Sequence, residues 1–442
     1  MKSNFPRLVI AATQSGSGKT TITAGLLGAL KNRGLSVQPY KVGPDYIDTG
    51  WHALACGRTS HNLDSWLMGT DNIRKIFTDT AADADISIIE GVMGLYDGGR
   101  DGISSTAEIS KLLDAPVVLV IDAKSMGTSA AAIALGFREY DRTVKLAGVI
   151  LNRLGSASHE KIIVDALNNV GIKIFGALHR NDEFTLPERH LGLVPTSENF
   201  AVDATKKISA AVESQLDVDA LIALARTAVP LENFVRNEKF SPAVKIAVAR
   251  DAAFNFYYDA SLTVLERLGA QIVFFSPLED ETLPAGIDGL IIGGGFPEVF
   301  AAQLERNEKI RTDIFRAAIE GLPIIGECGG YMYLMKEMID FDGRRYEMCG
   351  VIDGTATMTK RLQSVGYVEG RWDELTFRAH EFHYSTADIE ENLFTCRRLR
   401  DNQVFQAGVR YRNVIGSYLH VHFTGCPAFA ERFAHKCLTR QQ

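Results

Sequence analysis

The feature that most constrains the fold is a glycine-rich turn near the N-terminus. Residues 13–20 read Thr-Gln-Ser-Gly-Ser-Gly-Lys-Thr, after the predicted strand Arg7–Ala12 and before the predicted helix Thr20–Arg33. Glycines let the backbone approach phosphate oxygens, and a helix N-terminus points its amides at the anion. Thr13 stands where a longer P-loop has its first glycine, and a turn without a ligand is the alternative. We predict an ATP-phosphate site formed by Ser15, Gly16, Ser17, Gly18, Lys19 and Thr20.

The alternation of short apolar runs with helical patterns continues through the first half of the chain. Further β-rich runs cover residues 36–40, 86–90, 117–122 and 146–151. Strands separated by helix-length segments indicate βαβ units and a parallel sheet. The stretch 229–242 is polar and contains two prolines, which is typical of a linker. We predict an α/β fold with two domains, at 1–228 and 243–442, joined by the linker 229–242.

The second half begins with a similar series of strands and then changes. Residues 244–249, 271–275, 289–292 and 323–326 are apolar runs followed by helical patterns. The later runs 345–351, 365–371, 404–409 and 414–419 lack helices between them. We therefore predict that the second α/β domain carries an antiparallel portion.

Polar residues follow several strands of the first domain. Lys19 is predicted to neutralise the β- and γ-phosphates, Thr20 to hold Mg²⁺, and Glu90 to act as a second metal ligand. Asp45, Asp48 and Asp97 lie in loops after strand ends, where ligands of open α/β sheets bind. The alternative is that they are solvated loop acids. Asn152 is a candidate reader of the adenine edge, with a turn asparagine as the alternative.

A second chemical motif lies at residues 326–330, Gly-Glu-Cys-Gly-Gly, between an apolar strand and a helical pattern. This is a nucleophile elbow with Cys328 as nucleophile. The helix N-terminus is expected to lower the pKa of the thiol, and the Gly329 amide to donate to an oxyanion. Gly295 in the turn 293–298 is a candidate second donor, and His420 at a strand end is the candidate base. A buried structural thiol is the alternative for Cys328.

Composition narrows the function classes. The 442 residues contain 47 Lys plus Arg and 54 Asp plus Glu, so a net charge of −7 argues against a general nucleic-acid binder. The six cysteines are scattered without a CxxC pair, which favours a reduced, cytoplasmic protein. No signal peptide or membrane span is expected. His380-Glu-Phe-His383 lacks the HExxH spacing, so zinc is not predicted.

These motifs together resemble the glutamine-hydrolysing cobyrinic acid a,c-diamide synthase family across nearly the whole chain. The resemblance is carried by residues 15–20, 41–48 (Lys-Val-Gly-Pro-Asp-Tyr-Ile-Asp), 62–68 (Asn-Leu-Asp-Ser-Trp-Leu-Met), 90–97, 253–258, 293–298, 326–331 and 417–420. The first half also resembles dethiobiotin synthetase, and the second half resembles class I glutamine amidotransferases.

The resemblance implies ATP- and glutamine-dependent amidation of the a and c acetate side chains of cobyrinic acid in cobalamin biosynthesis. Cys328 would release ammonia from glutamine, and ATP would convert a substrate carboxylate into an acyl phosphate that ammonia attacks. Lys19, Thr20, Asp45 and Glu90 would then serve the nucleotide and Mg²⁺, and Asp48 and Asp97 the substrate or acyl phosphate. The implied partners are ATP, glutamine and a tetrapyrrole polycarboxylate, and a homodimer stays open.

One departure from class I amidotransferases concerns the triad acid, which stands two residues after the histidine. Here that position is His422, so we predict modest glutaminase activity that depends on an occupied synthetase site. Hydrogenobyrinic acid and nickel-sirohydrochlorin stay open as alternative substrates. Cobyric acid synthase is a further alternative, as is a P-loop switch ATPase fused to an inactive amidotransferase-like module.

Overall fold

The protein is described from a computed structural model that covers residues 2–180, 188–189, 192–193, 201–234 and 243–440. The chain divides into two compact units, residues 1–236 and 237–442. Part of the predicted linker, residues 235–242, lies outside the described residues. Before it, β11 (Leu231–Glu232) pairs antiparallel with β1 (Lys2–Ser3), so the end of the first unit returns to its beginning.

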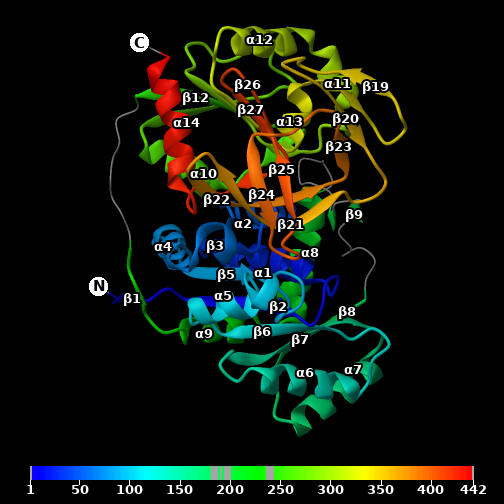
Figure 1. Ribbon diagram of the computed structural model, residues 1–442. Helices are drawn as coiled ribbons and strands as arrows, with labels where there is room; N and C mark the ends of the chain where they lie inside the picture. The colour runs from blue at the N-terminus through cyan, green and yellow to red at the C-terminus, as the bar shows by residue number, and fades with distance from the viewer. Residues whose placement is uncertain (1, 181–187, 190–191, 194–200, 235–242, 441–442) are drawn as a thin grey trace. The chain divides into compact units, whose positions relative to one another are not determined.

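The first unit is built around a seven-stranded parallel sheet in the order β4-β3-β5-β2-β6-β7-β8 (Figure 1). Its strands are β2 (Arg7–Ala12), β3 (Val37–Val42), β4 (His61–Leu63), β5 (Ile86–Glu90), β6 (Val117–Asp122), β7 (Leu146–Leu154) and β8 (Ile174–His179). The central strands are buried throughout and mostly apolar, as expected for a parallel sheet that helices cover on both faces. The predicted parallel sheet is confirmed.

Helices cover the two faces of this sheet. They are α1 (Lys19–Asn32), α2 (Ile47–Cys56), α3 (Ser65–Met68), α4 (Thr70–Thr80), α5 (Thr106–Leu112), α6 (Ser129–Tyr140), α7 (Ala157–Asn169), α8 (Ala201–Gln215) and α9 (Val218–Arg226), with a 3₁₀ turn at Arg100–Gly102 and short strands β9 (Glu188–Arg189) and β10 (Gly192–Leu193). Alternate residues of β2 enter different cores, because side chains of a strand point to opposite faces. Leu8 and Ile10 pack with α1, α8 and α9, whereas Val9 packs with α4 to α7.

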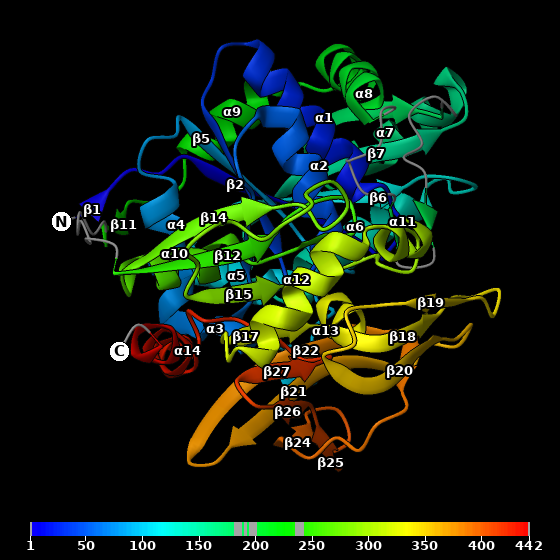
Figure 2. The ribbon, with the colours of Figure 1, turned by 90° about the horizontal axis from the view of Figure 1, so that it is seen from above.

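The second unit has a six-stranded sheet in the order β14-β12-β15-β17-β27-β26, which Figure 2 shows from above. The strands are β12 (Val244–Ala249), β14 (Ala270–Phe275), β15 (Gly289–Ile292), β17 (Ile324–Glu327), β26 (Val409–Tyr411) and β27 (Val414–Ser417). All neighbours are parallel except β26 and β27. The helices are α10 (Asp259–Arg267), α11 (Ala301–Arg306), α12 (Glu308–Ile319), α13 (Gly329–Leu334) and α14 (Pro427–Thr439).

The remaining strands of this unit form smaller sheets, in the orders β19-β18-β20-β23, β25-β24-β21-β22-β28 and β13-β16. They are β13 (Phe254–Phe256), β16 (Gly294–Gly295), β18 (Met335–Ile339), β19 (Arg345–Glu347), β20 (Ile352–Met358), β21 (Ser364–Trp372), β22 (Leu375–His383), β23 (Ser385–Ala387), β24 (Phe394–Arg398), β25 (Val404–Ala407) and β28 (His420–Val421). The antiparallel portion is present, but the assignment of residues 414–419 to it was wrong. β27 lies in the central sheet, parallel to β17, and only β28 joins the antiparallel sheet.

Candidate active sites

The predicted phosphate-binding turn lies between β2 and the first residue of α1. Gly16 and Gly18 have φ angles of +74° and +90°, in the left-handed region that glycine adopts without strain. The Ser17 hydroxyl closes the turn by donating to the carbonyl of Gln14, at 3.0 Å. Because the 14-residue helix α1 begins immediately afterwards, its N-terminal dipole lies directly behind the turn.

Lys19 is buried, and its ammonium donates to the carbonyl oxygen of Met93 at 2.6 Å. Burial lowers its pKa to about 8, with a further contribution from the positive charge of Lys41. Met93 has a φ angle of +45°, in a loop after β5, and this turn brings its carbonyl to the ammonium. Lys19 is therefore held beside the turn by backbone oxygens that a phosphate group can replace.

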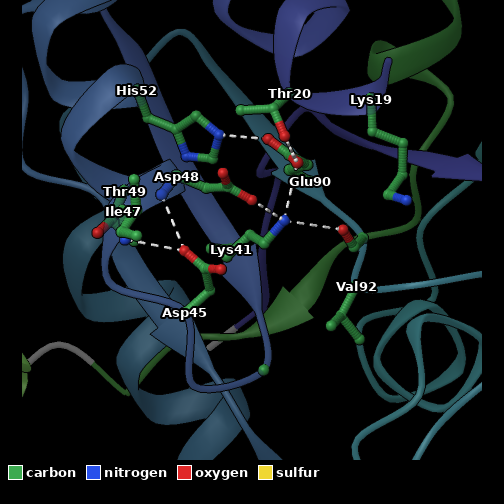
Figure 3. A network of polar contacts seen from close by, with 12 residues as sticks. Lys19, Thr20, Lys41, Asp45, Ile47, Asp48, Thr49, His52, Glu90 and Val92 are labelled. Atoms are coloured by element: carbon green, nitrogen blue, oxygen red, sulfur yellow. Dashed lines mark hydrogen bonds and ion pairs between the residues drawn. The ribbon is translucent and has the colours of Figure 1, made fainter. Parts of the chain in front are cut away.

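A buried polar network joins the N-terminus of α1 to the ends of β3 and β5 (Figure 3). The Thr20 hydroxyl donates to Glu90 Oε1 at 2.7 Å. The Lys41 ammonium lies 2.8 Å from the same Glu90 oxygen and 2.5 Å from Asp48 Oδ2, and also donates to the Gly91 carbonyl at 3.1 Å. The structure thus brings together Thr20, Glu90 and Asp48, three of the residues that the sequence predicted.

The other oxygen of Glu90 is held by His52, whose Nε2 lies 2.6 Å from Oε2. The opposite ring nitrogen of His52 lies 3.0 Å from the Ser60 hydroxyl, and the His52 side chain is fully buried. Burial alone would raise the pKa of Glu90, but Lys41 and His52 hold it far below its ordinary value. Glu90 is therefore ionised and fixed in orientation.

Asp45 and Asp48 differ in what they do locally. Asp45 Oδ1 accepts the backbone N–H groups of Ile47 and Asp48, at 2.9 and 2.8 Å, so it caps the start of α2. Burial raises the pKa of Asp48 to about 7, and the neighbouring Asp45 carboxylate raises it further while Lys41 opposes the change. Of the two, Asp48 is the one that contacts the Lys41–Glu90 network directly.

Asp97 and Asn152 both lie near the phosphate-binding turn. Asp97 is exposed and accepts the backbone N–H of Gly94 at 3.0 Å. Its negative charge is close enough to Lys19 to oppose, in part, the lowering of the Lys19 pKa by burial. The Asn152 amide donates to the carbonyl oxygen of Ser17 at 2.9 Å. A β-carbon on Gly18 would collide with that amide, so Asn152 packs against the turn itself from the end of β7.

The donor set at this site fits Mg²⁺, which prefers oxygen and is usually held by one or two carboxylates, waters and substrate phosphates. Thr20, Glu90 and Asp48 offer one hydroxyl and two carboxylates in one network. Across the described ranges, no group of three His, Cys, Asp or Glu side chains is arranged to hold a metal without other ligands. A cation here would therefore need oxygens from the nucleotide or water as well.

The nucleophile elbow in the second unit has the backbone that its sequence predicted. Cys328 has a φ angle of +50° between β17 and α13, and its N–H donates to the Ser417 carbonyl at 2.7 Å. Gly330 lies so close to the end of the neighbouring strand β15 that a β-carbon there would lie 2.6 Å from the Ile292 carbonyl carbon. These contacts hold the thiol at the carboxyl end of the central sheet.

The expected lowering of the Cys328 pKa is not what the structure shows. Burial raises the pKa of the thiol to about 12, the carboxylates of Glu298, Glu327 and Glu381 raise it further, and the Gly329 backbone N–H lowers it in part. The helix α13 has only six residues and cannot outweigh the loss of solvation. Near neutral pH, the nucleophile is therefore a neutral thiol.

The two predicted oxyanion donors lie next to each other. The Gly330 N–H donates to the Gly293 carbonyl at 2.9 Å, and the Gly295 nitrogen lies 3.1 Å from where a Gly329 β-carbon would be. The turn is held in place by β16, which pairs with β13. In addition, the Gly293 N–H donates to the Tyr257 hydroxyl at 2.8 Å.

His420 is buried at the start of β28, three residues beyond Ser417, whose carbonyl binds the Cys328 N–H. A Gly294 β-carbon would lie 2.8 Å from its ring, so His420 faces the glycine turn. Burial lowers the pKa of His420 to about 3, assisted by His380 and His383. The residue at the usual position of the triad acid, His422, instead packs against Tyr258, with ring centroids 4.7 Å apart and the ring planes tilted by 31°.

Sequence reasoning missed Lys41, His52 and the two glutamates around Cys328. Lys41 is the last residue but one of β3 and begins the segment 41–48 that also contains Asp45, which was an available signal. His52 occupies the buried face of a helix, and its sequence context is typical of a core residue. Glu327 directly precedes the nucleophile, and burial raises its pKa to about 8. Its carboxyl accepts the backbone N–H of Val421 at 3.4 Å. Val421 stands between His420 and His422 in the chain.

Comparisons with known proteins match both halves of the chain. Residues 8–194 match the CobQ/CobB/MinD/ParA nucleotide binding domain, and residues 245–427 match the CobB/CobQ-like glutamine amidotransferase domain. The cobyrinate a,c-diamide synthases of Dehalococcoides mccartyi and Caldanaerobacter subterraneus are each 42% identical over 97% of this chain and 98% of their own. The hydrogenobyrinate a,c-diamide synthase of Streptomyces coelicolor is 41% identical, over 99% of this chain and 98% of its own. The chain therefore belongs to the cobyrinate a,c-diamide synthase family.

Proposed function

We propose that this protein is an ATP- and glutamine-dependent ligase that amidates the a and c acetate groups of cobyrinic acid in cobalamin biosynthesis. The observation that carries the proposal is that one chain holds a Cys328 elbow beside a glycine turn, and a phosphate-binding turn beside the Glu90 network. Relatives named for this reaction align with the chain over almost its whole length.

In the amidotransferase unit, Cys328 loses its proton to His420, and its sulfur attacks the amide carbon of glutamine. The Gly295 and Gly329 amides would stabilise the resulting oxyanion, and the closeness of these two glycines supports that role. Ammonia leaves, and water then hydrolyses the thioester to glutamate. A thiol pKa near 12 and an imidazole pKa near 3 disfavour this proton transfer, which supports glutaminase activity that is low until the synthetase site is occupied.

In the nucleotide-binding unit, a substrate carboxylate attacks the γ-phosphate of ATP, which yields an acyl phosphate and ADP. Lys19 and the turn 15–18 bind the phosphates, and Asn152 steadies the turn. Mg²⁺, held by Thr20 and Glu90 with Asp48 and Asp45 nearby, would neutralise phosphate charge. Asp97, exposed beside Lys19, is assigned to the substrate. Ammonia then attacks the acyl carbon, and phosphate leaves.

The test offers cobyrinic acid, hydrogenobyrinic acid and nickel-sirohydrochlorin in turn, with ATP, Mg²⁺ and glutamine labelled with ¹⁵N in its amide. Mass spectrometry is expected to find two labelled amides on cobyrinic acid. Cys328→Ala should abolish labelling from glutamine but keep amidation by free ammonia. Absence of double amidation on every ring would refute the proposal, and preference for another ring would reassign the substrate.

A further inference from the structure

The ammonium of Lys41 lies inside the group of oxygens that fits Mg²⁺. It contacts Glu90 Oε1 at 2.8 Å, Asp48 Oδ2 at 2.5 Å and the Gly91 carbonyl at 3.1 Å. A lysine ammonium has three N–H donors, and three oxygens receive them here. Figure 3 shows Nζ between the two carboxylates, with the Thr20 hydroxyl on the same Glu90 oxygen.

Burial makes this arrangement more than a surface ion pair. The exposed fractions of the side chains are 4% for Lys41, 0% for Glu90 and 13% for Asp48. Two carboxylates so far from water need a cation between them, because each would otherwise lose its solvation without compensation. When no metal is present, Lys41 supplies that charge.

We propose that Lys41 is an internal counter-cation that occupies the Mg²⁺ position of the nucleotide-free site and leaves it when Mg²⁺ enters with ATP. This inference deepens the proposed function, since it rests on ATP and Mg²⁺ binding at the same turn. Glu90 Oε1 already accepts the Thr20 hydroxyl and the Lys41 ammonium, so a Mg²⁺ ion that binds this oxygen has to displace one of these two donors.

The structure also indicates which partner moves. Glu90 is fixed from its far side by His52, at 2.6 Å, and His52 is held in turn by Ser60. Among the residues that the structure describes, the Lys41 ammonium contacts only these three oxygens, and it sits on a flexible four-carbon stem. Lys41 lies close enough to Lys19 to lower its pKa, so the phosphates bound by Lys19 offer the displaced ammonium new anionic partners.

The consequence is that free divalent metal binds weakly and the metal–nucleotide complex binds well. A metal entering without nucleotide must displace Lys41 and leave a buried ammonium unpaired, whereas ATP brings phosphate oxygens that compensate it. Binding of ATP and metal would thus be coupled through the Lys41 side chain. This coupling would keep divalent metal from occupying the site when no nucleotide is bound.

The test measures Mn²⁺ binding without nucleotide, by electron paramagnetic resonance of free Mn²⁺, in the full-length protein. Lys41→Met removes the ammonium and keeps the length of the side chain, so we expect at least about tenfold tighter Mn²⁺ binding than in the wild type. Lys19→Met is the matched control, because Lys19 donates to backbone carbonyls and not to a carboxylate. We expect it to change the affinity less than about threefold.

Two further measurements keep the outcome decisive. The double variant Lys41→Met, Glu90→Gln should lose the increase in Mn²⁺ affinity that Lys41→Met gives. That loss would show that the ion binds at the Glu90 carboxylate. If Lys41→Met does not fold, Lys41→Gln replaces it, and a wild-type crystal structure with Mg²⁺ and a non-hydrolysable ATP analogue should show Nζ away from Glu90. Equal Mn²⁺ affinity in wild type and variant, or Nζ still on Glu90 with the metal bound, would overturn the inference.

Failure of the proposed function has a different signature. If calorimetry finds no ATP binding to the wild type in the presence of Mg²⁺, the nucleotide assignment fails. The Mn²⁺ comparison still decides the place of Lys41 in that case, because it contains no nucleotide.

Discussion

The raised pKa of Cys328 gives a prediction that can be measured without substrate. Burial and three nearby carboxylates, those of Glu298, Glu327 and Glu381, raise the pKa of this thiol from about 9 to about 12. A difference of this size lowers the thiolate fraction near neutral pH about 1,000-fold, which corresponds to about 4 kcal/mol. Since alkylating reagents react with thiolate, the free enzyme should react very slowly at Cys328.

The assay follows alkylation by iodoacetamide from about pH 7 to about pH 9.5, with peptide mass spectrometry to isolate Cys328 from the other five cysteines, which are also buried. The rate should rise about tenfold for each step of one in pH, without a plateau. The shape of this curve does not depend on how accessible the thiol is, so slow access alone cannot imitate it.

Glu298→Gln provides the perturbation, because the Glu298 carboxylate is the largest cause of the raised Cys328 pKa after burial. We expect alkylation at about pH 8 to become about two- to tenfold faster. Glu320→Gln changes the charge equally at an exposed position after α12 and should leave the rate unchanged. A plateau below pH 9 in the wild type, or equal rates in both variants, would refute the reasoning.

Two further predictions concern folding and pH. Gly330→Ala would place a β-carbon 2.6 Å from the Ile292 carbonyl carbon, so it should lower the free energy of unfolding by about 1–3 kcal/mol and abolish glutaminase activity. Gly136→Ala in α6, with open space around it, is the control in urea titrations and should not destabilise. The pKa of His420 is lowered from 6.5 to about 3, so the unfolded chain binds a proton there between these values and stability falls as pH falls. From pH 7 to pH 5 the wild type should therefore lose about 2 kcal/mol more than His420→Gln, and equal losses would contradict the lowered pKa.

Local sequence patterns were sufficient to predict the two turns that carry the candidate active sites. The phosphate-binding turn and the Cys328 elbow each depend on neighbouring residues, on a preceding apolar strand and on a following helix, and all of these are visible in the sequence. β2, β5 and β6 have the predicted bounds for the same reason, since a buried parallel strand is a continuous apolar run.

Non-local contacts were not predictable in the same way. The placement of β27 beside β17 joins segments about 90 residues apart, and no local periodicity specifies which strand pairs with which. Similarly, the pKa of Cys328 depends on how deeply the thiol is buried and on Glu298, which comes from another turn. The contacts of Lys41 depend on the direction of one long side chain, which the sequence does not encode locally.

No helix among the described residues has the length and apolar character needed to cross a membrane. The nucleotide-binding unit and the amidotransferase unit each match a known domain family along most of their length. The roles assigned to individual residues were each argued from contacts within one unit.

The hydrogen bond from the Cys328 N–H to the Ser417 carbonyl has a consequence during synthesis on the ribosome. The sheet of the first unit is complete once His179 has emerged, whereas the elbow lacks its partner strand until residue 417 has been made. A nascent chain would therefore acquire its nucleotide-binding fold long before its reactive cysteine is positioned. Ammonia could then not be released by an enzyme that is still being translated.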